Sequence, residues 1–418
     1  AAEGNDGDTR ITDVALGPNG DIYVTGTFFG EVVFQRPQQG AIIFNSATPS
    51  GFVAWASPEG DWIDAFEVLD LQPKSLALDP DGAIYVGGRP QLARRYDQNG
   101  NVEWNEDELP DTLSIDHLAY GIGPKGPMLY ITGTNDIGLG ADVFLAQINA
   151  DGGGINWVTQ VSSPADEQAG GVGVGPQGEV RLAFSSKDPA VQYEGEQRWD
   201  PPDSEARHAY VLRIDDEGGL RWGTLLAEAF GGDEQMVPRD LAVDPFGNSH
   251  VAISFTLDYV FEDVVFTGNE DAGVITVDAR GVAYNFDRNI GDPVDIGYGV
   301  AAPTRDLQIL VGSYSGQGDS TFGDNPGLPA VADPRGFFAT LEPNPSQGAY
   351  IVTDPAGGSV EEIANTINNL DGQVYRTLDD QQTTGVLFVA AFVTDETIQD
   401  LAGLLDVRPD LPLAEDGM

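Results

Sequence analysis

A Gly- and Pro-containing turn followed by an apolar strand recurs along the chain, and this repeat limits the folds open to it. The segment "GPNGDIYVTGT" occupies residues 17–27, and a degenerate copy, "APTRDLQILVGS", begins at Ala302. The other copies begin at Asp79, Gly123, Gly175 and Asp244. Their Pro residues lie between 44 and 69 residues apart. Self-similarity at a period of about 50 residues is typical of propellers and solenoids.

Each repeat also carries a second pair of strands around an acidic or Gly-rich turn, as in "YVLRIDDEGGLRW". Trp104, Trp157 and Trp222 each lie four residues beyond a turn Gly. Trp62 lies two residues beyond Gly60, so the two-residue period of a strand places it on the same face. Because large aromatic side chains dominate β-rich cores, we expect these Trp residues to pack between repeats rather than to bind a ligand. Four antiparallel strands per repeat are the make-up of a β-propeller blade.

The pattern D/G-P-x-G-x-I-Y-V-x-G, followed by a third strand and D-x-x-G-x-x-x-W, resembles the β-propeller repeats of bacterial extracellular proteins. It extends over residues 10–345, and the six copies predict a six-bladed β-propeller at residues 1–345. A fold of this kind carries no activity by itself. The sixth copy reaches "RGFFATLEPNP" at residues 335–345, after which no fourth strand follows. The last blade is therefore expected either to be incomplete, with an edge that needs covering, or to be completed by the linker or the C-terminal region.

From Gln347 onward the pattern changes to strands alternating with amphipathic helices. Apolar strands are predicted at residues 349–354, 373–378 and 385–393, and an extended segment at 406–416. Ser359 and Thr394 have the character of helix N-caps, and each precedes an apolar stripe at helical spacing. The order βαββαβ predicts a small α+β ferredoxin-like domain at residues 346–418, so that the whole chain is mainly β.

This module resembles the propeptide and inhibitor domain of subtilisin-like proteases. The resemblance rests on Tyr350 to Val352, on "NNLDGQVYR" and "DETIQDLAGLLDV", and on the closing segment. It implies a sheet that packs against the protease and an extended tail in the active-site cleft. The docking residues implied for this chain are Leu411, Pro412, Leu413, Ala414, Glu415 and Asp416.

Two features of the module depart from that family. A propeptide precedes its enzyme, whereas this module follows a propeller with no protease attached, and Pro412 removes a backbone donor from the tail. The module is therefore also expected to dock onto another folded partner, such as a second copy of this protein.

The formal net charge is −47, from 67 acidic and 20 basic residues. Such a surface repels nucleic acid and anionic membranes, and it suits a saline or extracellular setting where salt screens the repulsion. Cysteine is absent, which excludes disulfides and thiolate catalysis. The chain begins with Ala1 rather than Met, and we expect a secreted protein whose signal peptide has been removed.

The sequence shows no catalytic motif: there is no nucleophile elbow, phosphate loop or HExxH. Of the three His residues, His250 falls inside a repeated strand, which favours packing, and His117 and His208 have no metal-site spacing. Acidic turns at residues 5–8, 79–82 and 215–219 could hold Ca²⁺, although turn geometry already explains their Asp and Asn residues. No catalytic, cofactor or metal residues are therefore assigned.

These features predict a secreted, non-enzymatic structural or interaction protein that joins a propeller to a docking module and assembles head-to-tail into a filament or surface layer. One alternative is an inhibitor or chaperone of a subtilisin-like protease carried on a propeller. Another is a propeller enzyme or lectin with its site at the central channel, for which the sequence offers no positive feature.

Overall fold

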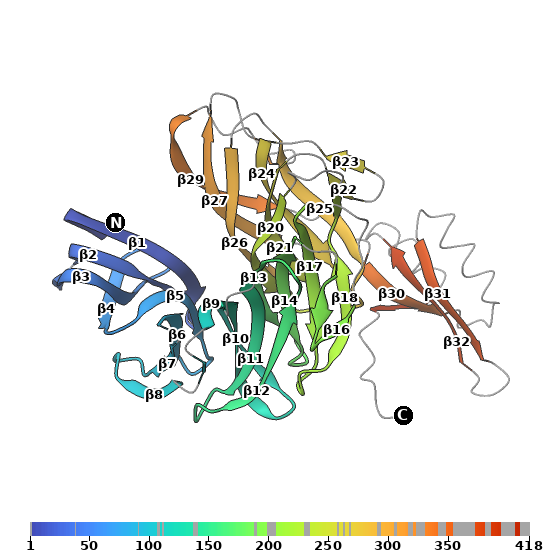
Figure 1. Ribbon diagram of the computed structural model, residues 1–418, viewed down its shortest axis with the longest axis horizontal. Coiled ribbons are helices and arrows are strands. Elements are labelled where there is room, and N and C mark those ends of the chain that lie inside the picture. Colours follow the sequence, from blue (N-terminus) through green and yellow to red (C-terminus); the bar gives the residue numbers. More distant parts are fainter. Residues whose placement is uncertain are drawn as a thin grey trace. The chain divides into compact units, whose positions relative to one another are not determined.

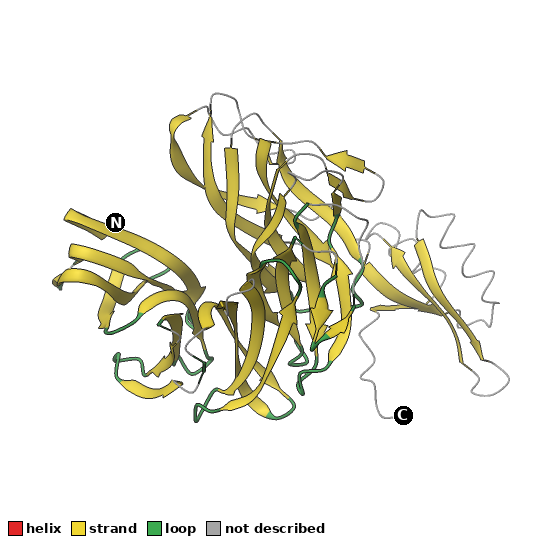
Figure 2. Ribbon diagram, in the orientation of Figure 1, coloured by secondary structure: helices red, strands yellow, loops and turns green. Residues whose placement is uncertain are grey.

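The computed structural model describes residues 2–341 apart from loop segments, together with four strands nearer the C-terminus. The segments of four or more residues outside this description are 137–140, 199–205, 230–234, 317–320, 323–330, 342–347, 354–372, 381–385, 394–405 and 410–418. All described elements are β-strands (Figure 2), so none of them is a helix that could span a membrane. The chain divides into two compact units, residues 1–303 with 309–339 and residues 304–308 with 340–418.

Within the larger unit, antiparallel sheets follow one another along the chain (Figure 1). The first sheet contains β1 (Ala2–Leu16), β2 (Ile22–Arg36), β3 (Gly40–Ala56) and β4 (Trp62–Val68). The second contains β5 (Gln72–Leu78), β6 (Ile84–Arg89), β7 (Leu92–Tyr96) and β8 (Val102–Glu106). The third contains β9 (Leu113–Gly123), β10 (Gly126–Asp136), β11 (Ala141–Asn149), β12 (Ile155–Ser162), β15 (Gln192–Tyr193) and β16 (Glu196–Gln197).

Four further sheets follow in the described part of the larger unit. The fourth contains β13 (Glu167–Val174), β14 (Val180–Ser186), β17 (His208–Ile214) and β18 (Leu220–Leu225). The fifth contains β20 (Gln235–Val243), β21 (Ser249–Thr256), β24 (Asn269–Val277), β25 (Ala283–Ile290) and β28 (Thr321–Phe322). The last contains β26 (Val294–Thr304), β27 (Leu307–Gly316) and β29 (Val331–Leu341), and a small side sheet contains β19 (Glu228–Ala229), β22 (Tyr259–Phe261) and β23 (Val264–Phe266).

The recurring Pro-x-Gly segments are the turns between the first and second strands of these sheets. Asp79 opens one turn, and its Oδ1 accepts the main-chain N–H groups of Asp81 and Ala83 at 3.0 and 2.8 Å. Gly82 takes φ +86°, a left-handed conformation that favours glycine. The acidic residue and the glycine therefore serve the turn itself, as the sequence indicated.

A β-bulge interrupts the first strand of each of the first five sheets. The unmatched residues are Thr12, Lys74, Asp116, Gly170 and Arg239. In the first three sheets a glycine on the second strand lies opposite the bulge, and a Cβ at Gly133 would lie 1.7 Å from the carbonyl oxygen of Ser114. The glycine that ends the I-Y-V-x-G pattern is therefore needed because the two main chains approach closely there.

The Trp residues of the repeat pack between sheets, as predicted. Trp104 Nε1 donates to the carbonyl of Ala150 at 3.0 Å, Trp157 to that of Asp216 at 3.1 Å and Trp222 to that of Ala279 at 3.2 Å. Each acceptor lies in a hairpin turn of the next sheet, so each Trp ties its own sheet to its neighbour.

Trp62 does not share this face, and the prediction for it is wrong. Trp62 pairs with Ala56, and Asp64 pairs with Trp55. A bulge between these two pairs reverses the face of the sheet to which the successive side chains of the strand point. Phe66 instead lies against the turn of the second sheet, where a Cβ added to Gly100 would be 2.7 Å from its ring. Trp62 packs on Phe34 of its own sheet, with ring centroids 5.1 Å apart.

The first sheet is distinguished by a long hairpin, residues 29–47, that curls back over one of its faces. Phe52 pairs with Gly26, and Phe34 lies eight residues beyond Gly26 on the same strand. In a straight strand these eight residues would place Phe34 about 26 Å from Gly26. Yet the Phe34 and Phe52 ring centroids are 5.3 Å apart, and both side chains are fully buried. Since the opposite face packs on the second sheet through Tyr23 and Val53, the hairpin covers the face turned away from that sheet.

The N-terminal segment also differs from expectation. Residues 5–8, considered above as an acidic turn, belong to β1, where Asn5 pairs with Glu31 and Asp8 with Phe29 across an irregularity. They therefore extend the first sheet rather than forming a Ca²⁺-binding turn.

The smaller unit contains β30 (Gly348–Thr353), β31 (Gln373–Asp380), β32 (Val386–Val393) and β33 (Asp406–Pro409). The strand order is β31-β32-β30-β33, and neighbouring strands are antiparallel. The predicted helices at 359–370 and 394–405 and the docking tail at 411–416 lie outside the described residues.

Candidate functional site

The first strands of successive sheets lie against one another, and polar side chains beside their bulges join them. Asp13 follows the bulge of β1, and its Oδ2 accepts the hydroxyl of Ser75 and the main-chain N–H of Leu76, both at 2.7 Å. Ser75 follows the bulge of β5, and its Oγ in turn accepts the N–H of Leu118 on β9 at 3.0 Å. One chain of hydrogen bonds thus connects three sheets.

The same joint recurs further along the chain. Asp240 follows the bulge of β20, and its Oδ2 accepts the N–H of Val300 on β26 at 3.0 Å. Gly171 has the matching position on β13, where a Cβ would lie 2.6 Å from the nitrogen of Leu241. The fourth and fifth sheets therefore meet by direct approach of their main chains. We call Asp13, Ser75, Gly171 and Asp240 the joint residues.

The two joint carboxylates titrate unusually. Burial raises the pKa of Asp13 to about 6, against hydrogen bonds from Ser75, Leu76 and Val14 that lower it. Burial also raises the pKa of Asp240 to about 7, and the negative charge of Asp13 raises it further. The charge of Asp13 on the first sheet therefore acts on Asp240 of the fifth sheet, and both side chains retain partial contact with solvent.

These pKa shifts predict that the folded protein loses stability as the pH rises from about 4 to about 7. At pH values between the pKa of an unfolded Asp and the raised pKa in the fold, each of these groups binds more protons in the folded than in the unfolded state. The free energy of unfolding therefore falls as the pH rises through this range. Asp240→Asn keeps an oxygen for the Val300 N–H and removes one titration. We expect the slope to become shallower by up to about 1.4 kcal/mol per pH unit, measured by urea unfolding at several pH values.

Asp64→Asn, at an exposed position of β4, is the matched control and should leave this slope unchanged. An unaltered slope in Asp240→Asn would contradict the assignment of the titration to the joint.

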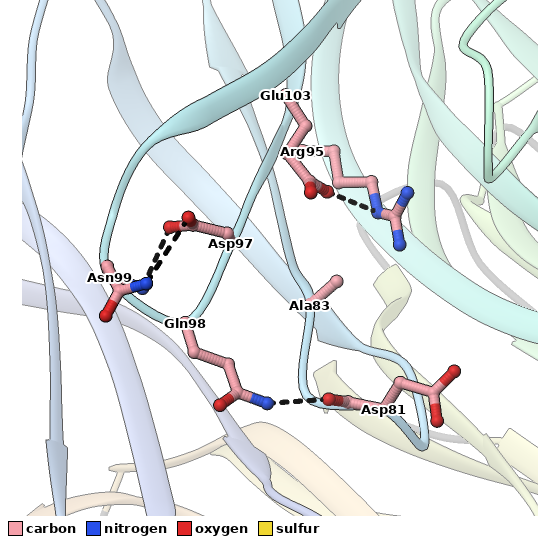
Figure 3. A pocket seen from close by; sticks show the side chains of 7 residues that line it. All are labelled: Asp81, Ala83, Arg95, Asp97, Gln98, Asn99 and Glu103. Atoms are coloured by element: carbon pink, nitrogen blue, oxygen red, sulfur yellow. Dashed lines mark hydrogen bonds and ion pairs between the residues drawn. The ribbon is translucent and has the colours of Figure 1, made fainter.

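A shallow pocket of about 280 Å³ lies on the second sheet (Figure 3). Its lining is Asp81, Ala83, Arg95, Asp97, Gln98, Asn99 and Glu103. These polar groups bind one another: Gln98 Nε2 donates to the Asp81 carbonyl at 2.7 Å, and Arg95 Nε lies 3.2 Å from Glu103 Oε2. Hydrogen bonds from Asn101 and Asn99 lower the pKa of Asp97 to about 2, so it stays ionised. The pocket is therefore lined by mutually paired side chains from two turns and from the strands β7 and β8, rather than being a preformed ligand cavity.

Two of the residues considered above for catalysis or metal binding have structural roles. His250 is buried, with Nε2 3.2 Å from Asp244 Oδ2 and Nδ1 3.3 Å from Thr276 Oγ1, which confirms its packing role. Asp215 Oδ1 accepts the N–H groups of its own turn, from Glu217 and Gly219, as turn geometry predicted. Within the described part of the chain no three His, Asp or Glu side chains gather where they could hold a metal ion.

Sequence reasoning missed the joint residues. A usable signal precedes three of the turns: Asp13 begins "DVAL", Ser75 begins "SLAL" and Asp240 begins "DLAV", whereas the segment from Gly171 reads "GVGV". A small polar residue before an apolar-Ala-apolar triplet marks the joint. Its partner cannot be deduced, because that N–H belongs to another repeat.

The sheets above define the class of protein: consecutive sheets, mostly of four or more strands, that are joined through their first strands form a β-propeller. No protein-family model and no curated protein matches the sequence. Among solved structures, the Dos1 propeller is 11% identical and covers 74% of this chain and 78% of that chain, with a TM-score of 0.42.

Two other solved structures are also similar to this chain. Sqt1 of Chaetomium thermophilum, bound to the N-terminus of the ribosomal protein L10, is 13% identical, covers 96% of this chain and 97% of its own, and has a TM-score of 0.42. A calcium-binding regucalcin from Agrobacterium tumefaciens is 12% identical, with coverage of 72% and 81% and a TM-score of 0.38. Likeness at this level says nothing of activity.

Proposed function

We propose that this protein is a secreted, non-enzymatic structural protein that associates with copies of itself head-to-tail, forming an extracellular filament or surface layer. Its body is a six-bladed propeller with an incomplete last blade. Its C-terminal domain at residues 346–418 docks onto a neighbouring subunit through residues 411–416.

The observation that carries this proposal is the difference between the two ends of the propeller. The last sheet has three strands among the described residues, whereas the first, second and fourth have four. At the other end, the hairpin at residues 29–47 covers part of the face on which a preceding blade would pack. The two ends of the ring are therefore unlike, and contacts between unlike surfaces that do not close build open assemblies.

The smaller unit supports a docking role. The order β31-β32-β30-β33, with all neighbours antiparallel, is the order that two consecutive βαβ units give in a ferredoxin-like domain. We infer that the domain is ferredoxin-like and similar to the propeptide of subtilisin-like proteases, whose role is to bind a folded surface.

Light scattering and electron microscopy of the purified chain test the proposal. Because the net charge is −47, we expect monomers at low ionic strength and assemblies once salt or Ca²⁺ screens the repulsion. A protein that stays monomeric at high concentration in both salt and Ca²⁺ would contradict the proposal.

The strand order of the smaller unit also favours a second function, inhibition or chaperoning of a subtilisin-like protease. Adding the full chain to such a protease measures this directly, and a lack of inhibition at micromolar concentration excludes it.

A further inference from the structure

The first strand of the first sheet exposes an apolar strip at positions that the later sheets bury or half-bury. Val14 follows joint residue Asp13 and is 52% exposed, and Leu16 is 69% exposed. The residues at the position of Val14 in the later sheets are Leu76, Leu118, Val172, Leu241 and Val300, with exposures of 4%, 8%, 5%, 4% and 9%. The preceding sheet covers them in each case. The strip on β1 is thus the receiving half of an interface that the chain forms repeatedly.

The last sheet exposes the opposite half. Gln308 and Leu310 of β27 are fully buried, and a Cβ at Gly297 would touch both Leu310 and Ala272 of the fifth sheet, so this face packs on that sheet. Strand alternation turns Ile309 and Val311 to the other face, where both are only partly buried. In the second sheet the residue on the corresponding face, Tyr85, is fully buried by the third sheet.

The joint positions of the two halves are also compatible. Val300 N–H binds Asp240 as Leu76 N–H binds Asp13, so Gly299 occupies the joint position of the last sheet. Gly171 shows that a glycine at this position lets the two main chains meet directly. A last sheet with Gly299 can therefore approach the N–H of Val14 in the manner of the fourth and fifth sheets.

We propose that the strip of Val14 and Leu16 on one copy receives the face of Ile309 and Val311 on the last sheet of a second copy. Among the described residues, Val14 and Leu16 are exposed and Ile309 and Val311 are only partly buried, which leaves both halves available to a second copy. The face of the first sheet and that of the last sheet also match in width. The hairpin at residues 29–47 already covers the outer part of the first sheet's face, and the last sheet has three described strands to cover the rest. This inference rests on the proposed function and specifies one of its contact surfaces.

Cross-linking between single-cysteine variants tests the contact, because the chain contains no cysteine of its own. Val14→Cys and Val311→Cys, mixed under assembling conditions with a short thiol-specific cross-linker, should give a covalent dimer, and each variant alone should give far less. The double variant should give a ladder of multimers. An exclusively intramolecular link in the double variant would show that the ring closes within one chain and would overturn the inference.

Charge substitution provides the second test. Val14→Asp with Leu16→Asp should raise the concentration needed for assembly at least tenfold, with an unchanged unfolding midpoint because both side chains are exposed. The control is Leu69→Asp with Ile122→Asp, at positions 62% and 59% exposed. Normal assembly of the Val14 and Leu16 variant would overturn this contact while leaving self-association intact. A monomeric wild type would overturn both this contact and the proposed function.

Discussion

Replacing Gly133 by Ala is expected to lower the free energy of unfolding by about 3 kcal/mol, near the upper end for overpacking. A Cβ there would lie 1.7 Å from the Ser114 carbonyl oxygen and 3.0 Å from the nitrogen of Asp116. Both atoms are main chain at the bulge of β9, so no side-chain rotation relieves the contact. The strand would have to move, and with it the joint to the neighbouring sheet. Urea unfolding followed by Trp fluorescence measures the change.

Gly152→Ala is the matched control for Gly133→Ala. Gly152 lies in the turn between β11 and β12 of the same sheet, and a Cβ there would meet nothing within 4 Å. We expect its effect to remain within about 0.5 kcal/mol, as for other surface substitutions. Equal stabilities of the two variants would show that the close approach at the bulge does not make glycine necessary for the stability of the fold.

The repeat made most of the propeller predictable. Turn position, strand order within a blade and the packing of Trp104, Trp157 and Trp222 all follow from local patterns of period two and from turn chemistry. Trp62 shows the limit of this reasoning, because one inserted bulge residue reverses the alternation and sends its side chain to the other face. A bulge leaves no local signature as clear as that of a turn.

The hairpin and the joints were not predictable for a different reason. The contact of Phe34 with Phe52 depends on a curl between residues far apart along two strands. Likewise, Asp13 acquires its role from the N–H of Leu76, which belongs to the next repeat. Contacts of long sequence separation are fixed by packing, whereas the sequence displays only the periodicity of each strand.

At the position where the first three sheets place Tyr, the fourth sheet places a buried charge. Arg181 is fully buried, and its Nη2 lies 3.2 Å from Glu179 Oε1 and 3.3 Å from the Gly247 carbonyl. Its guanidinium carbon is 5.2 Å from the centroid of the Trp222 ring. Burial lowers the pKa of Arg181 to about 10, which leaves it charged at neutral pH. Glu179 is therefore the counter-charge that makes this burial tolerable.

Glu179→Gln should accordingly destabilise the protein by about 3 to 5 kcal/mol, because it removes the carboxylate that pairs with a buried cation between the fourth and fifth sheets. Combining it with Arg181→Met removes the charge while keeping an apolar side chain against Trp222, and this double variant should return to within about 1 kcal/mol of the wild type. Urea unfolding of the two single variants and the double variant yields the coupling energy. Additive losses in the double variant would mean that packing around these side chains, and not their charges, sets the stability of this interface.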